Sequence, residues 1–190
     1  LGVVVGCSAQ RDQNEGKAGP EQPNIILFIV DDLGWQDTSV PFHEQRTPFN
    51  DRYQTPNMER LADQGMLFTN AYSASPVCTP TRSSIITGKN PARTNITDWT
   101  LRNDVEEMER TGPDYPVKSP DWTDAGVQPD SSLLTERLKA EGYRTIHVGK
   151  AHFGALETPG EDPVNLGFDV NIGGHAAGAP GSYWPEDNYD

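Results

Sequence analysis

A cysteine, a proline and an arginine at alternate positions are the strongest chemical signal in this sequence. Cys78 is followed by Pro80 and Arg82, and a glycine, Gly88, comes six residues later. Proline favours the first turn of a helix and glycine its end, so we expect a short helix over this stretch. Cys78 would then face unpaired backbone N–H groups, with Arg82 one turn further on the same face. This arrangement suits a side chain that becomes anionic, although a buried structural cysteine would give the same spacing.

Two adjacent carboxylates provide a second candidate site. Asp31 and Asp32 directly follow an apolar run over residues 24–30. The length and β-branched content of this run predict a strand buried on both faces, as in a parallel sheet. Paired carboxylates at a strand end need a cation to offset their charge, and hard oxygen ligands suit Ca²⁺ or Mg²⁺. A solvated acidic turn or a helix cap remains the simpler alternative.

A lysine and a histidine follow another predicted strand. The stretch 143–148 has strand character, and Lys150 and His152 come just after it. Such a pair is by itself common on protein surfaces. In α/β sheets, however, ligands bind beyond the carboxyl ends of the strands. We therefore expect the two strand ends, with Asp31 and Lys150, to lie near one site.

The elements between these residues alternate between helix and strand, which predicts an α/β fold. The first helix is expected to begin at the Thr55–Pro56 cap and to stop at Gly65. A strand over residues 66–72 and a polar surface excursion over residues 90–128 should follow. A later helix, capped by Ser131 or Asp130, should end at Gly142. The predicted inward side chains are Met58, Leu61 and Ala62 in the helix that begins at Pro56, and Leu133, Leu134 and Leu138 in the helix that ends at Gly142.

The stretch from Cys78 to Gly88 resembles the signature of the type I sulfatases, the formylglycine-dependent, arylsulfatase-like enzymes of the alkaline phosphatase superfamily. The resemblance implies an α/β sandwich with a central, largely parallel or mixed sheet flanked by helices, incomplete at its carboxyl end. It also implies that a maturase oxidises Cys78 to formylglycine. One hydroxyl of the hydrated aldehyde then attacks sulfur, and the second expels sulfate, which is nucleophilic catalysis.

Residues 142–152 resemble the second signature of that family. By resemblance, Lys150 binds sulfate and the formylglycine oxygen, and His152 takes a proton as general base. Arg82 belongs to the catalytic set, and Asp31, Asp32 and the modified Cys78 hold the metal, usually Ca²⁺ with Mg²⁺ as the alternative. The family often has a bulky residue where this chain has Ala151, and the smaller alanine side chain would widen the floor of the site. The remaining metal ligands and the leaving-group acid are expected beyond residue 190.

Charge and the amino end constrain the partners and the compartment. With 15 basic and 28 acidic residues, the net charge is −13, which argues against binding to nucleic acid or to an anionic membrane surface. Residues 4–7 resemble a bacterial lipobox ending at Cys7, although a trimmed signal peptide would look similar. We expect residues 1–22 to be a leader remnant and tether, and residues 23–190 the amino-terminal part of the catalytic domain. The protein would be exported, as a periplasmic or outer-membrane lipoprotein whose only membrane contact is a lipid anchor at Cys7.

The predicted activity is hydrolysis of sulfate monoesters, on a sulfated carbohydrate or an aryl sulfate. The alternatives are a phosphatase or phosphonate hydrolase of the same superfamily, a non-catalytic carbohydrate-binding relative, and a thiol hydrolase using unmodified Cys78. Among the histidines, His175 lies in a glycine-rich loop, His147 is expected to be structural and His43 to be on the surface. Four further aromatic residues could stack on sugar rings or simply pack: Trp99, Trp122, Tyr183 and Trp184.

Overall fold

The computed structural model describes residues 3–6, 22–99, 101–102 and 126–180. They belong to two compact units, Leu1–Ser73 and Ala74–Asp190. The predicted tether and the middle of the 90–128 excursion lie outside the described residues. So do Cys7, Trp122, Tyr183 and Trp184.

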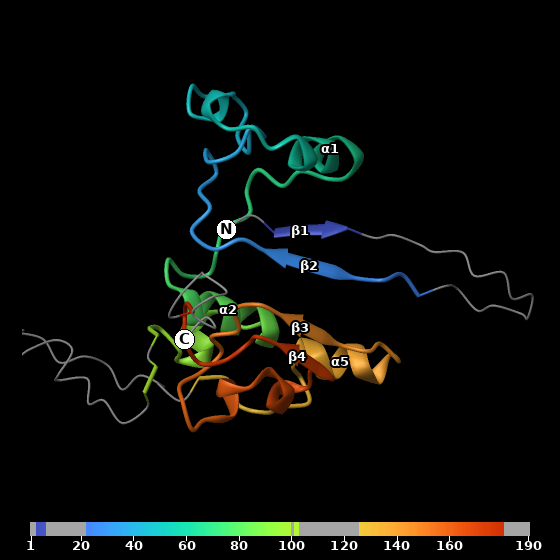
Figure 1. The fold of residues 1–190 in the computed structure, drawn as a ribbon, viewed down its shortest axis with the longest axis vertical. Coiled ribbons are helices and arrows are strands. Elements are labelled where there is room, and N and C mark those ends of the chain that lie inside the picture. The colour runs from blue at the N-terminus through green and yellow to red at the C-terminus, as the bar shows by residue number, and fades with distance from the viewer. Residues whose placement is uncertain (1–2, 7–21, 100, 103–125, 181–190) are drawn as a thin grey trace, which may run out of the picture. The chain divides into compact units, whose positions relative to one another are not determined.

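A two-stranded antiparallel sheet opens the first unit. Strand β1 (Val3–Gly6) pairs with β2 (Ile26–Ile29), and Val3 lies opposite Ile29 (Figure 1). The predicted strand is therefore confirmed over residues 26–29. The prediction of a parallel strand buried on both faces is wrong, because Ile26 is 60% exposed and Phe28 is 63% exposed. An apolar run favours burial, but burial needs a covering layer, and the described residues of this unit do not supply one.

Helix α1 (Pro56–Gln64) confirms the predicted start at Pro56 and the end at Gly65. Its expected apolar face, with Met58, Leu61 and Ala62, is half-buried. The following stretch, residues 66–72, forms no strand, and Tyr72 is 86% exposed. That prediction is wrong because β-propensity reflects packing against a sheet neighbour, and these residues have none among those described.

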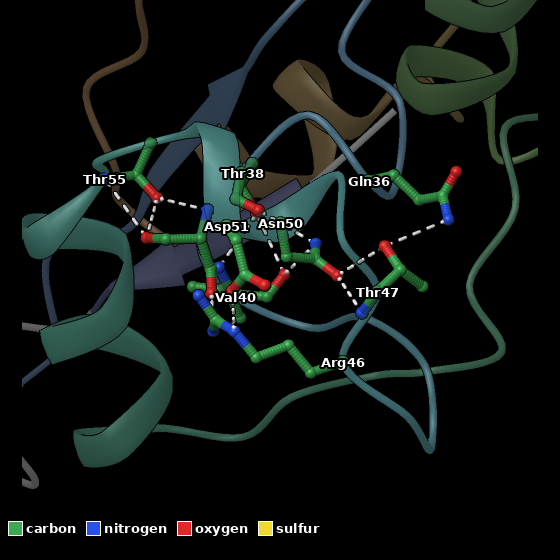
Figure 2. A network of polar contacts seen from close by, with 9 residues as sticks. Gln36, Thr38, Val40, Arg46, Thr47, Asn50, Asp51 and Thr55 are labelled. Atoms are coloured by element: carbon green, nitrogen blue, oxygen red, sulfur yellow. Dashed lines mark hydrogen bonds and ion pairs between the residues drawn. The ribbon is translucent and has the colours of Figure 1, made fainter.

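A buried polar network organises the loop between β2 and α1 (Figure 2). At its centre is Asn50, fully buried in the short 3₁₀ helix η1 (Asn50–Arg52). The Asn50 amide donates to the Thr38 carbonyl at 2.9 Å, and its oxygen accepts from the Thr47 N–H at 2.9 Å. The Thr55 hydroxyl accepts from the Ser39 N–H at 3.0 Å instead of capping α1. The network thus fixes the chain that follows Asp31 and Asp32 by tertiary hydrogen bonds.

The described residues of the second unit form three helices, two strands and two 3₁₀ turns. Strands β3 (Ile146–Val148) and β4 (Val170–Ile172) pair in parallel (Figure 1). Helix α2 (Cys78–Thr87) contacts both α3 (Pro91–Thr94) and α5 (Leu134–Ala140). The turns η2 (Pro159–Glu161) and η3 (Pro163–Leu166) connect β3 to β4. A parallel pair with helices makes this unit α/β, as predicted. Its buried core consists of Ile86, Ile96, Val127, Leu133, Ala151, Phe153 and Leu166.

Helix α5 differs from its prediction at its start. The helix begins at Leu134 without a side-chain cap, and the Asp130 carboxylate accepts instead from the Ser132 N–H. Leu133 is buried and Leu138 half-buried as predicted, whereas Leu134 is 40% exposed. Burial of Leu133 at the N-cap position sets where the helix begins, which overrides the local capping preference.

The 90–128 stretch is not only a surface excursion. Residues 91–94 form α3. Near its two ends, the 90–128 stretch supplies two core side chains, Ile96 and Val127. The Val127 N–H donates to the Phe153 carbonyl at 2.8 Å.

Within the described ranges, no helix is both long enough and apolar enough to cross a membrane.

We predict that Asn50→Ala lowers the free energy of unfolding by about 2 kcal/mol, because it leaves the buried Thr38 carbonyl and the Thr47 N–H unpaired. The matched control is Gln36→Ala, which removes one peripheral bond to the Thr47 hydroxyl at 3.2 Å and should cost about 0.5 kcal/mol or less. Denaturant titration of the purified proteins measures both. Equal losses in the two variants would contradict a central role for Asn50.

Candidate active site

Helix α2 places Cys78 at its first residue, as the sequence predicts. The loop before it is fixed by Thr81, whose hydroxyl accepts from the Ser75 N–H at 3.1 Å and donates to the Ser75 carbonyl at 2.7 Å. Val77 occupies the N-cap and makes no side-chain cap hydrogen bond. At the other end, Gly88 adopts a left-handed conformation with φ 66°, which glycine adopts without strain. The half-buried thiol of Cys78 therefore lies at the electropositive end of a ten-residue helix.

Arg82 and Lys150 meet at this helix start, although 68 residues separate them in sequence. Arg82 is 7% exposed, and its guanidinium donates to the backbone carbonyl of Lys150 at 2.5 Å. The Lys150 ammonium in turn donates to the Cys78 sulfur at 3.1 Å. A buried guanidinium is stable only where its donors are satisfied. The same contact that gives the Arg82 guanidinium an acceptor thus holds the Lys150 backbone near the thiol.

His152 lies two residues beyond Lys150 and is 2% exposed. Its backbone has φ 51°, a left-handed conformation that is uncommon for residues other than glycine. The His152 N–H donates to the His175 carbonyl at 3.1 Å, which anchors it to the glycine-rich loop after β4. A Cβ at Gly178 would lie 2.7 Å from the imidazole Cε1, so this loop can approach the ring only with glycine there.

Ala151, between the two candidate residues, is fully buried in the core and does not line an open floor. A larger side chain there would have to displace its core neighbours. The departure from the usual family pattern is therefore accommodated by packing beneath the site.

His147 is a structural histidine, as predicted from its position in a strand. Its imidazole packs edge-on against Phe153 at 5.7 Å and against Phe168 at 5.3 Å between ring centroids. Burial lowers the pKa of His147 below its ordinary value, and the positive charge of Arg82 lowers it further. Hydrogen bonding with Asn171 and the Lys150 backbone opposes this shift. The neutral imidazole is therefore the form that the folded protein favours.

Asp31 and Asp32 lie in the first unit, at the carboxyl end of β2. Asp31 is half-buried, and Asp32 is exposed with φ 54°. Among the described residues, no group of three or more His, Cys, Asp or Glu side chains could hold a metal ion. The structure therefore brings Cys78, Arg82 and Lys150 together within the second unit, whereas the aspartate pair belongs to the first. The expectation that both strand ends share one site stays a prediction.

Two neighbours of His152 are not identified by the sequence motifs. The sequence presents Trp99 only as one of several aromatic residues, yet its ring lies 5.9 Å from that of His152. His175 contributes its backbone carbonyl, which no side-chain pattern reveals. The small residues at 173–178 were the one available signal, because they indicate a close approach of backbone to a neighbour. His43 is exposed, as predicted, and packs against Trp35 at 5.4 Å.

The chain belongs to the sulfatase family, whose family model matches residues 23–189. Sulfatase domains have the alkaline-phosphatase-like α/β fold, so the predicted fold class is confirmed. The family is generally dependent on formylglycine and binds a divalent metal.

Several curated proteins are similar to this chain. N-acetylgalactosamine-6-sulfatase of Sus scrofa is 36% identical over 156 residues, which are 81% of this chain and 26% of that protein. Arylsulfatase of Hemicentrotus pulcherrimus is 34% identical over 161 residues, 82% of this chain and 25% of that protein. Steryl-sulfatase of Homo sapiens is 35% identical over 156 residues, 80% of this chain and 23% of that protein. The chain spans about a quarter of the length of these relatives.

We predict that the thermal stability of the protein falls between pH 7 and pH 5 in a way that depends on His147. Because its pKa is lowered by folding, the unfolded chain takes up the proton first, near the ordinary value of 6.5. The contribution of neutral His147 is complete above that pH and is lost as the pH falls through the lowered pKa.

Melting temperatures of His147→Phe, which keeps an aromatic ring among Phe153 and Phe168, should decline less over this range than those of the natural protein. His43→Phe is the control, since it removes an exposed imidazole from the chain. If His43→Phe flattens the pH profile as much as His147→Phe does, the argument from burial fails.

Proposed function

We propose that the complete natural protein containing this sequence hydrolyses sulfate monoesters at a nucleophile made from Cys78. The observation that carries the proposal is the Lys150 ammonium, held 3.1 Å from the Cys78 sulfur at the first residue of α2. A cation and unpaired backbone N–H groups favour an anionic ester and the charge that develops on its oxygens during transfer. Membership in the sulfatase family and the names of the relatives support the same reaction.

The surroundings of Cys78 fit formylglycine. The side chain is half-buried and free of any disulfide, and an oxygen in place of its sulfur could still accept from Lys150. When hydrated, formylglycine supplies a hydroxyl nucleophile for sulfur. Lys150 would orient this hydroxyl and bind a sulfate oxygen, while Arg82 holds the Lys150 backbone in position. A maturase acting on Cys78, Pro80 and Arg82 is the partner that this modification requires.

His152 is proposed as the general base that takes the proton from the second hydroxyl. Its burial and its left-handed backbone conformation support a positioned role, because strain of this kind persists only where the surroundings impose it. The anchor to the His175 carbonyl is one of those constraints.

Asp31 and Asp32 are proposed to bind the divalent metal, with Ca²⁺ as the expected ion. Two carboxylates at one strand end fit a hard cation, and the left-handed backbone of Asp32 supports a specific role for that residue. The bound metal would supply positive charge to polarise the ester oxygens. Cys78 is proposed to complete the ligand set after its modification.

The substrate is proposed to be a sulfated carbohydrate or an aryl sulfate, as the names of the relatives suggest. We further propose that residues 1–22 are a leader and tether, that the catalytic domain begins at residue 23, and that the protein is exported. A lipid on Cys7 would then anchor it at the periplasm or the outer membrane.

We predict that the peptide containing Cys78, taken from protein made together with a formylglycine-generating enzyme, carries an aldehyde in place of the thiol. Mass spectrometry measures this conversion directly. Cys78→Ala should reduce sulfate release by at least ~10³-fold, since it removes the nucleophile. Cys7→Ser is the control and should keep the specific activity. Intact cysteine in a fully active enzyme would rule out the formylglycine mechanism.

We predict that Asp31→Asn and Asp32→Asn each weaken Ca²⁺ binding at least tenfold. Changing a residue that only supports a metal ligand already lowers metal affinity by about tenfold or more, and a change to the ligand itself should cost at least as much. Calorimetric titration gives the affinity, and the Ca²⁺-dependent rise in melting temperature gives a second readout that does not depend on activity. Asp63→Asn, an exposed carboxylate on α1, is the control. Unchanged Ca²⁺ binding in both site variants would remove the aspartate pair from the metal site.

A further inference from the structure

We propose that Trp99 determines substrate specificity by stacking on the ring that carries the sulfate ester. The shared chemistry is a ring with a flat apolar face, either the C–H face of a sugar or an aryl ring. The inference deepens the proposed function, because it concerns the leaving group of that reaction.

The position of Trp99 beside His152 is the first argument. Their ring centroids are 5.9 Å apart and the planes are inclined by 58°. His152 is itself two residues from Lys150, whose ammonium contacts Cys78. Trp99 therefore lies beside the segment that carries Lys150, and the proposal requires an ester bound at Lys150 to extend along this segment to the indole.

The segment that carries Trp99 is held at both of its ends. Ile96, three residues before it, is 3% exposed and belongs to the hydrophobic core. Two residues after it, the Leu101 carbonyl accepts from the Leu156 N–H at 2.8 Å. The backbone N–H of Trp99 donates to the Asp98 carboxylate at 2.8 Å. These contacts restrict the backbone of the tryptophan, so little conformational entropy is lost when a ligand binds.

The exposure of Trp99 is the third argument. The residue is 48% exposed, although it is in contact with a histidine that is 2% exposed. The core aromatic residue Phe153 is 6% exposed by comparison. A tryptophan that only supported His152 would gain from burying the rest of its surface. The exposed surface of Trp99 therefore offers a place on which a ligand ring can pack.

The test measures binding to the Cys78→Ala form of the complete natural protein, which cannot turn its ligands over. Three sulfate esters are titrated by calorimetry: a sulfated hexosamine, 4-nitrophenyl sulfate, and hexyl sulfate, which has no ring. Trp99→Ala should weaken binding of a ring ester about tenfold and change hexyl sulfate binding less than about twofold. Trp99→Phe should restore most of the loss, because it returns an aromatic face.

The matched control is Phe49→Ala, an aromatic residue of similar exposure, 47%, in the first unit. It should change none of the three affinities. A loss confined to the hexosamine identifies a sugar ring as the partner of Trp99, and a loss confined to 4-nitrophenyl sulfate identifies an aryl ring. Equal loss for all three esters, no loss for either ring ester, or no binding of any ester before Trp99 is changed would overturn the inference.

The proposed function is measured separately, as sulfate release by the protein with Cys78 intact. If that protein hydrolyses no sulfate ester, the proposed function fails. A ring-dependent loss of binding in Trp99→Ala would still support the stacking role. Conversely, an active sulfatase whose Trp99→Ala variant lowers kcat equally for ring and ringless esters would make Trp99 a support for His152.

Discussion

The hydrogen bond from Arg82 to the backbone carbonyl of Lys150 is the contact on which the candidate site depends. Arg82 is 7% exposed, so its guanidinium needs acceptors from the protein, and one of them comes from a segment 68 residues away. This hydrogen bond fixes the loop after β3 against α2. The Lys150 ammonium then reaches the Cys78 sulfur at 3.1 Å. Stability and site geometry are therefore coupled through a single buried charge.

Local signals explain why helices α1 and α2 could be predicted from sequence. Pro56 and Gly65 bound α1, and Gly88 ends α2 in a left-handed conformation. Each signal acts within one turn of the chain, so it needs no knowledge of the rest of the fold. The placement of Cys78 at a helix start follows from the same rules. The family resemblance implies only that Arg82 and Lys150 both belong to the catalytic set, and no local pattern encodes the contact between these distant segments.

Features that depend on tertiary partners could not be predicted in the same way. The apolar residues of β2 were expected to be buried, but Phe28 is 63% exposed because its burial requires a covering layer. Leu134 was expected to face inward, and the burial of its neighbour Leu133 turns it outward instead. Strand β4 pairs with β3 from 24 residues away, between Ile146 and Val170. Periodicity reports which side chains favour burial, but it does not report what will cover them.

The charge of the chain bears on how an anionic ester could be bound. A net charge of −13 repels anions at long range, so attraction has to come from charges within a few ångströms. Lys150 and the start of α2 provide such charges beside Cys78. In the proposed reaction they would bind the sulfate group, which all sulfate esters share, and so they would not discriminate between esters. Discrimination must come from groups that contact the remainder of the molecule, and an uncharged aromatic face such as that of Trp99 meets this need without adding to the repulsion.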